Sequence, residues 1–214
     1  TKSLILGPNG SGKTTFFRAI CGLTNIASGH ILIDEKNVES IFASTGVLST
    51  NFQEVYTLLA LNVYDLIRLY TDLSDGSPDR AFDIIQDLGI SSDLLKKHEL
   101  KELSAGQQKI VCTALSLAMK SKHILLDEPF EQLDPARKGR MIKHLEEYEG
   151  VILVNTHETW LLRNLLKWVV FFMFEGLLYG PLPVEDLLDA EISLTDEPDA
   201  LLKVPIANKT ISIL

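Results

Sequence analysis

Short apolar segments alternate along the chain with segments whose apolar residues recur every three or four positions. Several of the short segments are apolar at every position, which is typical of strands covered on both faces of a parallel sheet. The pattern therefore predicts an α/β fold with a largely parallel sheet. The predicted strands cover residues 3–6, 30–33, 46–48, 123–126, 151–154 and 168–174.

Helical spacing predicts helices at 13–21, 104–120, 135–148 and 184–188, with Ser104 and Asp134 as caps. The strand pattern is missing between residues 56 and 103, where apolar residues keep the helical spacing, so we expect an inserted helical subdomain there. We assign residues 1–190 to one domain. Residues 191–214 form a tail, in which the alternation around Asn208-Lys209 favours a small two-stranded β appendix.

Composition restricts the possible partners. The chain has 20 basic and 29 acidic side chains, a net charge of −9, which argues against a whole-surface attraction to nucleic acid or anionic lipid. The most apolar run, 168–174, has seven residues, whereas a membrane span needs about 20. Cys21 and Cys112 show no metal-ligand spacing, and we expect both to be small buried side chains in a reducing compartment.

Residues 7–15 read GPNGSGKTT and lie between a predicted strand and a predicted helix. Glycine, four free positions, glycine, lysine and a hydroxyl residue form the pattern of a phosphate-binding loop. Its glycines let backbone N–H groups converge on phosphate oxygens, and the helix start adds partial positive charge. The expected nucleotide contacts are Gly7, Asn9, Gly10, Ser11, Gly12, Lys13, Thr14 and Thr15.

Two acids, Asp127 and Glu128, follow the predicted strand 123–126. The carboxyl ends of parallel strands meet at one edge of a sheet, the edge that carries the phosphate loop. We expect Asp127 to hold Mg²⁺ through its water shell, and Glu128 to orient and polarise the water that attacks a γ-phosphate. The alternative is an ordinary solvated acidic turn.

His157 follows the predicted strand 151–154, which ends at the same edge. A hydrogen bond from its imidazole to the γ-phosphate or to the attacking water is the functional interpretation. A histidine with a purely structural role is the alternative.

Ser104 caps a predicted helix whose start is suited to an anion. That helix would be roughly 24 Å long, longer than the strand that follows it, at about 16 Å. Its start should therefore extend beyond its own site, and we expect it to complete the site of a second chain. An ordinary capped helix is the alternative.

Taken together, these motifs resemble the ATP-binding subunit of ABC transporters. Residues 7–14 are similar to Walker A, 124–128 to Walker B and 103–107 to the signature sequence. Gln53 is similar to the glutamine of the Q-loop, Leu133-Asp134 to the D-loop and His157 to the switch histidine. The resemblance implies a P-loop NTPase core and ATP held between Walker A of one subunit and Ser104 and Gly106 of another. It also implies Mg²⁺ near Thr14, Gln53 and Asp127.

The same resemblance implies a Mg²⁺-dependent ATPase with Glu128, His157, Lys13 and Gln53 as its catalytic residues. Its partners would be a second ATP-binding subunit and transmembrane permease subunits, which would hold it at the cytoplasmic face of the cell membrane; no nucleic acid is expected. One alternative is a non-transport ABC-type ATPase that acts on ribosomes or DNA. Another is a protein that binds ATP without hydrolysing it.

The chain departs from the family pattern in three places. Ala105 replaces a glycine of the signature, and Glu131-Gln132 replaces small residues before the D-loop. The family also places two strands and an adenine-stacking aromatic residue ahead of Walker A, whereas six residues precede Gly7 here. We therefore expect the chain to lack those strands: either it is a fragment or that base contact is absent, and we name no adenine contact.

Overall fold

The computed structural model describes residues 1–41, 44–206 and 209–214, and it divides into two compact units. The first unit consists of Thr1–Phe16 and Leu153–Leu214, and the second of Phe17–Ile152. The boundary falls inside the helix α1 (Lys13–Ile20) and the strand β6 (Val151–Thr156).

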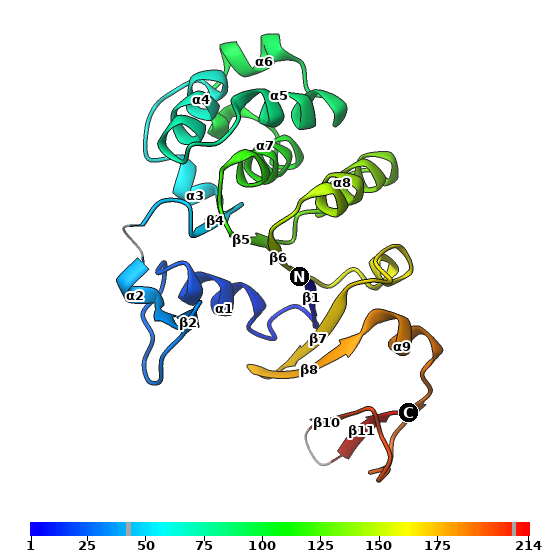
Figure 1. Cartoon of the computed structure of the whole chain (residues 1–214). Helices are drawn as coiled ribbons and strands as arrows, with labels where there is room; N and C mark the ends of the chain where they lie inside the picture. Colours follow the sequence, from blue (N-terminus) through cyan, green and yellow to red (C-terminus); the bar gives the residue numbers. More distant parts are fainter. Residues whose placement is uncertain (42–43, 207–208) are drawn as a thin grey trace. The chain divides into compact units, whose positions relative to one another are not determined.

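The sheet of the first unit carries the glycine-rich loop at the end of its buried strand β1 (Lys2–Leu6). β1 lies next to β6 and pairs in parallel with β7 (Val169–Phe174) in a register that sets Leu6 opposite Phe172. β7 pairs antiparallel with β8 (Leu177–Pro183), as Figure 1 shows. The sequence analysis missed β8, although Glu175-Gly176 between two apolar runs is a typical hairpin turn.

The tail of the first unit follows η2 (Thr159–Asn164) and α9 (Val184–Asp189) along the chain. It forms three antiparallel strands rather than the expected two, in the order β10 (Leu202–Ile206), β11 (Lys209–Ile213) and β9 (Ile192–Ser193). Asn208, in the predicted turn, lies outside the described residues.

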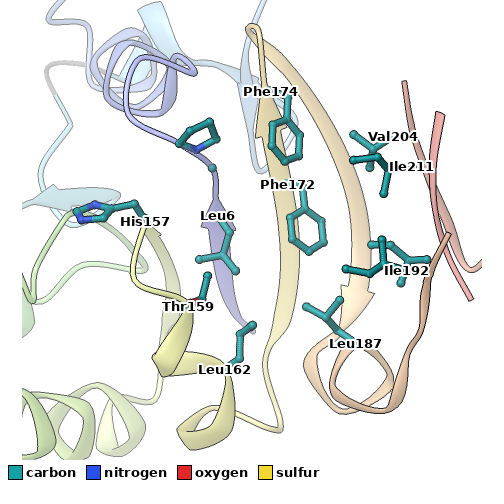
Figure 2. Close-up of a pocket in the computed structure, with 13 residues that line it drawn as sticks. Leu6, His157, Thr159, Leu162, Phe172, Phe174, Leu187, Ile192, Val204 and Ile211 are labelled. Carbon is teal, nitrogen blue, oxygen red and sulfur yellow. The ribbon is translucent and has the colours of Figure 1, made fainter. Parts of the chain in front are cut away.

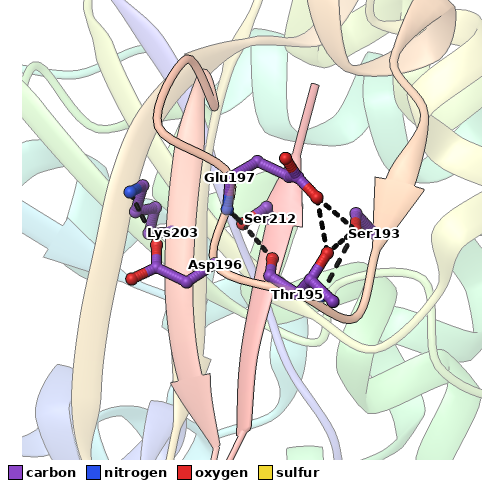
Figure 3. Close-up of polar contacts among 6 residues, drawn as sticks. All are labelled: Ser193, Thr195, Asp196, Glu197, Lys203 and Ser212. Carbon is purple, nitrogen blue, oxygen red and sulfur yellow. Dashed lines mark hydrogen bonds and ion pairs between the residues drawn. The ribbon is translucent and has the colours of Figure 1, made fainter.

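Polar contacts fix the segment between β9 and β10 (Figure 3). The Glu197 carboxylate accepts hydrogen bonds from the Thr195 hydroxyl at 2.5 Å and the Ser193 hydroxyl at 3.3 Å. The buried Ser212 hydroxyl donates to the Thr195 carbonyl at 2.7 Å and accepts from the Glu197 N–H at 3.1 Å. These contacts attach the segment to β11. The third strand, β9, pairs with β11 at Ile192 and Ser193, and the alternation of apolar residues does not reveal the polar contacts that follow it.

The second unit contains the parallel pair β4 (Leu48–Thr50) and β5 (His123–Asp127), with Thr50 opposite Leu125. The predicted strand 30–33 was wrongly placed in this sheet. It forms instead a separate antiparallel hairpin of β2 (Leu32–Ile33) and β3 (Lys36–Asn37), in which the Leu32 side chain is exposed. The physical reason is that only three apolar residues precede the Asp34-Glu35 turn, too few for a strand that is buried on both faces.

Helices make up most of the second unit. The interval without strand pattern contains α4, α5 and α6, which lie together in Figure 1. α7 is buried at every position from Ile110 to Ala118 and contacts α4, α5, β4 and β5. Asn62, Ser77, Ser104 and Asp134 cap α4, α5, α7 and α8 through their side chains. The helices are α2 (Val38–Ile41), α3 (Gln53–Tyr56), α4 (Val63–Leu73), α5 (Pro78–Asp87), α6 (Ser92–Lys97), η1 (Leu100–Glu102), α7 (Ala105–Ala118) and α8 (Pro135–Glu147).

The predicted α/β fold with a mainly parallel sheet is confirmed, since both β1–β7 and β4–β5 are parallel pairs. Among the described residues, no helix combines the length and the apolar character that crossing a bilayer requires. Both thiols are free; Cys112 is buried as predicted, whereas Cys21 is half-buried. Burial raises the pKa of each thiol to about 12.

Candidate functional site

The glycine-rich loop of the first unit depends on left-handed backbone that only glycine adopts without strain. Gly10 and Gly12 have φ values of +81° and +105°. The Ser11 N–H donates to the Pro8 carbonyl at 3.2 Å, and the Gly176 N–H in the β7–β8 turn donates to the Ser11 carbonyl at 2.9 Å. The loop is therefore held from within and from the neighbouring hairpin, directly before the first turn of α1.

Lys13 lies buried inside this loop, where its Nζ donates to the Gly7 carbonyl at 2.8 Å and the Pro8 carbonyl at 3.1 Å. The Ser11 hydroxyl is also buried and has no hydrogen-bond partner among the described residues. An unsatisfied buried hydroxyl costs about 1–3 kcal/mol. A phosphate oxygen would satisfy it, so the loop fits a phosphate group. Asn9, Gly10, Thr14 and Thr15 are exposed, which leaves the loop open to a ligand.

His157 follows β6, and with Gly7 and Pro8 it lines a cavity of about 460 Å³ in the first unit. The structure thus brings His157 to the start of the glycine loop (Figure 2). The remaining lining is apolar apart from Thr159, and the half-buried rings of Phe172 and Phe174 face it from β7. The sequence analysis missed this cavity because it treated 168–174 as a fully buried strand. The other lining residues are Leu6, Leu162, Leu187, Ile192, Val204, Ile211 and Ile213.

The acidic pair lies in the second unit, where Asp127 ends β5 and Glu128 follows it. Both residues are half-buried, and Glu128 has a φ of +44°. This left-handed conformation is uncommon for a residue with a Cβ, and such strained residues cluster at functional sites. Asp34 and Glu35, in the turn between β2 and β3, share this conformation, so the backbone alone does not distinguish Glu128 from a residue of an ordinary solvated turn.

Asn51 contacts both backbone groups of Asp127. Its Oδ1 accepts from the Asp127 N–H at 2.8 Å, and its Nδ2 donates to the Asp127 carbonyl at 3.2 Å. Lys109 in α7 donates to the same carbonyl at 3.0 Å. The sequence analysis missed both residues. The one sequence signal for Asn51 was its position two residues before Gln53. Gln53 itself is half-buried at the start of α3.

Ser104 and Gly106 lie at the start of α7. The Ser104 hydroxyl accepts from the Gln107 N–H, and the Gln107 side chain accepts from the Ser104 N–H at 3.0 Å, which is a reciprocal capping box. Ser104 and Ala105 are exposed, so the helix start is accessible within its unit. A Cβ added to Gly106 would lie 3.0 Å from the Gln132 carbonyl, so the residues before the D-loop approach this helix closely.

The donors proposed for Mg²⁺ are a hydroxyl, an amide and a carboxylate: Thr14, Gln53 and Asp127. All three supply the oxygen atoms that this ion prefers. No group of three or more His, Cys, Asp and Glu side chains suited to a metal occurs in the part of the chain that the structure describes. Mg²⁺ commonly binds through one or two carboxylates together with water and substrate phosphates, and the proposed donors include one carboxylate.

Comparison with known proteins decides the family. The model of the family described as "ABC transporter" matches residues 1–131, which include the glycine loop, Ser104, Asp127 and Glu128. The chain belongs to the ABC transporter family. As an ABC protein, it is an ATPase with a nucleotide-binding P-loop.

Its relatives include ATP-binding subunits of transporters. The lipopolysaccharide export system ATP-binding protein LptB of Escherichia coli (strain K12) is 33% identical over 165 residues, which cover 72% of this ABC protein and 67% of LptB. The glutamine transport ATP-binding protein GlnQ of Geobacillus stearothermophilus is 30% identical, covering 86% and 79% of the two chains. The chain is also similar to the crystal structure of a protein provisionally assigned as the cobalt transport ATP-binding protein cbiO-2. The match covers 100% of this chain and 80% of the cbiO-2 chain, with 36% identity and a TM-score of 0.90.

Proposed function

We propose that this protein is the Mg²⁺-dependent, ATP-hydrolysing subunit that powers an ABC transporter through membrane partner subunits. The observation that carries the proposal is the glycine loop with Lys13 folded into it, in a chain that also has the acid pair of an ATPase. The relatives support the transport role, since LptB and GlnQ are named as ATP-binding proteins of an export system and of glutamine transport.

Each candidate residue has a role that its chemistry suits. The loop amides, the Ser11 hydroxyl and Lys13 bind the phosphates and stabilise the charge that develops on the transferred group. Glu128 accepts the proton of the attacking water, and His157 hydrogen-bonds the γ-phosphate or that water. Thr14, Gln53 and Asp127 hold Mg²⁺, which neutralises phosphate charge when bound.

A second ATP-binding subunit completes the site through Ser104 and Gly106. Lys109 reaches the end of β5, and Ser104 precedes it by five residues. The helix start therefore lies about 7.5 Å from Lys109 along the helix axis at the α-helical rise. Its exposed, capped N-terminus suits the phosphate of another chain, because the helix dipole favours an anion there.

The membrane partner docks at the segment between α3 and α4. The Leu58 and Leu59 side chains are 79% and 51% exposed there, beside a groove of about 180 Å³ that Leu66 and Leu100 also line. Exposed apolar side chains next to a groove are typical of protein interaction sites. Gln53 begins the helix that precedes this segment, so it can relay the nucleotide state to the partner.

Affinity purification of the native complex tests the transport role. We expect integral membrane subunits to co-purify with the wild-type chain and to be lost with Leu58→Asp. Leu73→Asp is the matched control, because Leu73 is 62% exposed on α4 but does not line the groove. Co-purification of ribosomes or DNA, without membrane subunits, would favour a non-transport ATPase instead. Membrane association through the partner would place the protein at the cytoplasmic face of the cell membrane.

A further inference from the structure

We infer that Asn51 and Lys109 are positioning residues for ATP hydrolysis, which hold the peptide between Asp127 and Glu128 in the orientation that the two acids need. This inference rests on the roles proposed above for Asp127 and Glu128. It adds two residues that touch neither nucleotide nor metal in that proposal, and that act through the backbone of the acid pair.

The Asn51 side chain continues the β4–β5 ladder after its backbone has ended. The last backbone pair is Thr50 with Leu125. One residue later, the Asn51 amide accepts from the Asp127 N–H and donates to the Asp127 carbonyl, as a neighbouring strand would. Its other Nδ2 hydrogen goes to the Thr113 hydroxyl at 3.2 Å, which fixes the orientation of the amide. Asn51 is buried, so solvent cannot replace these bonds at low cost.

Lys109 strengthens the same arrangement from α7. Its Nζ lies 3.0 Å from the Asp127 carbonyl, which therefore accepts two hydrogen bonds, one of them from a charged donor. Hydrogen bonds from charged donors are roughly twice as strong as neutral ones. Because a peptide is planar, fixing this carbonyl also fixes the direction of the Glu128 N–H.

The residue after this peptide needs such support. Glu128 has a φ of +44°, a conformation that costs of order 1–3 kcal/mol and persists only where its surroundings hold it. Three hydrogen bonds to the Asp127 backbone contribute to that hold: Asn51 accepts one and donates one, and Lys109 donates the third. We expect the loss of these bonds to let the peptide rotate and to move both carboxylates away from their working positions. Misplacement by about 1 Å can cost 10²-fold in rate.

The test compares Asn51→Leu, which keeps a similar volume but removes the amide, with Ser49→Ala. Ser49 is a matched control because it is buried on β4 and its hydroxyl donates to the Ser116 carbonyl at 3.1 Å, away from the acids. We expect Asn51→Leu to lower kcat by about 10- to 100-fold with KM for ATP unchanged. Ser49→Ala should keep the wild-type kcat, even where its thermal stability falls equally.

A second readout does not depend on turnover. Electron paramagnetic resonance can measure the affinity for Mn²⁺ with adenylyl imidodiphosphate present. We expect this affinity to fall about tenfold in Asn51→Leu, because removing a residue that orients a metal ligand typically weakens metal binding by at least that much. The affinity for the nucleotide in EDTA should stay at the wild-type value. Lys109→Met should lower kcat and the Mn²⁺ affinity by smaller factors, and Lys109→Arg should keep both values close to wild type. These two variants test the inference even where Asn51→Leu does not fold.

The outcomes separate this inference from the proposed function. If Glu128→Gln abolishes hydrolysis while Asn51→Leu and Lys109→Met keep wild-type kcat and Mn²⁺ affinity, the positioning role is overturned and the proposed function stands. If Glu128→Gln retains full activity, the role of the acid pair itself is wrong.

Discussion

Gly7 lies directly against the carbonyl oxygen of Met173, so that a Cβ on Gly7 would be 2.3 Å from that oxygen. Gly7 begins the phosphate loop and Met173 belongs to β7, the parallel neighbour of β1. No real Cβ approaches a backbone atom so closely. The glycine is therefore required by the packing of the loop against its own sheet.

Gly7→Ala should abolish ATP binding, because either the loop or β7 must shift to admit the methyl group. A fluorescent ATP analogue titrated into the purified variant would measure the loss. Gly139→Ala is the control: apart from the backbone of α8 itself, no atom of the described residues lies within 4 Å of a Cβ added there, and the position is exposed. It should bind nucleotide normally and unfold at a higher temperature, since alanine in a helix is favoured by roughly 0.5–1 kcal/mol over glycine.

Glu128→Gln should lower the rate of phosphate release by about 10³-fold while ATP still binds, because the amide cannot accept the proton of the attacking water. Steady-state phosphate release and equilibrium nucleotide binding, measured on the same preparation, check both parts. Glu149→Gln, at an exposed position of the same unit, should leave both values unchanged. Equal activity of Glu128→Gln and wild type would remove Glu128 from the mechanism.

A comparison of Ser104→Ala with Ser77→Ala tests whether Ser104 only caps a helix or also contacts ATP. Each serine accepts a hydrogen bond from a backbone N–H three residues on, at the start of α7 and of α5. Each substitution should cost about 1 kcal/mol of unfolding free energy, measured with urea. Only Ser104→Ala should also lower ATPase activity, since Ser104 is proposed to contact the ATP of a second subunit. Equal activity of the two variants would make Ser104 an ordinary cap.

The thiols should be unreactive in the native protein. Burial favours the neutral form and raises the pKa of Cys21 and of Cys112 to about 12, so almost no thiolate exists at pH 8. Ellman's reagent should therefore label neither thiol rapidly at pH 8, and both in guanidinium chloride. Rapid labelling of one thiol in the folded protein would contradict its burial.

Sequence patterns predicted the fold where local chemistry determines it. The glycine loop, the Ser104 and Asp134 caps and the strand before Asp127 follow from spacing and side-chain type. The Glu175-Gly176 turn was a signal for β8, but its residues Leu177 and Leu178 are exposed and lack the alternation of a half-buried strand. The hairpin at Asp34-Glu35 was misassigned for a similar reason, since a short apolar run does not say which sheet it joins.

The candidate site was predictable only where its residues belong to a sequence motif. Lys13, Asp127, Glu128 and His157 stand out by motif and position. Asn51 and Lys109 do not, because their partner is the backbone of Asp127, and a contact with backbone leaves no pattern in the side chains of the partner segment. Only the fold, which sets the end of β4 beside the end of β5, makes that contact visible.

A crystal structure of the protein with adenylyl imidodiphosphate and Mg²⁺ would show whether the proposed site residues surround one triphosphate. We expect one nucleotide whose phosphates contact Lys13 and the loop amides, with Asp127, Glu128 and His157 around its γ-phosphate. The distances from the γ-phosphate to the Glu128 carboxylate and to the His157 imidazole are the decisive measurement, and both should allow a hydrogen bond directly or through one water. A nucleotide bound elsewhere, or a γ-phosphate remote from both side chains, would contradict the proposed site.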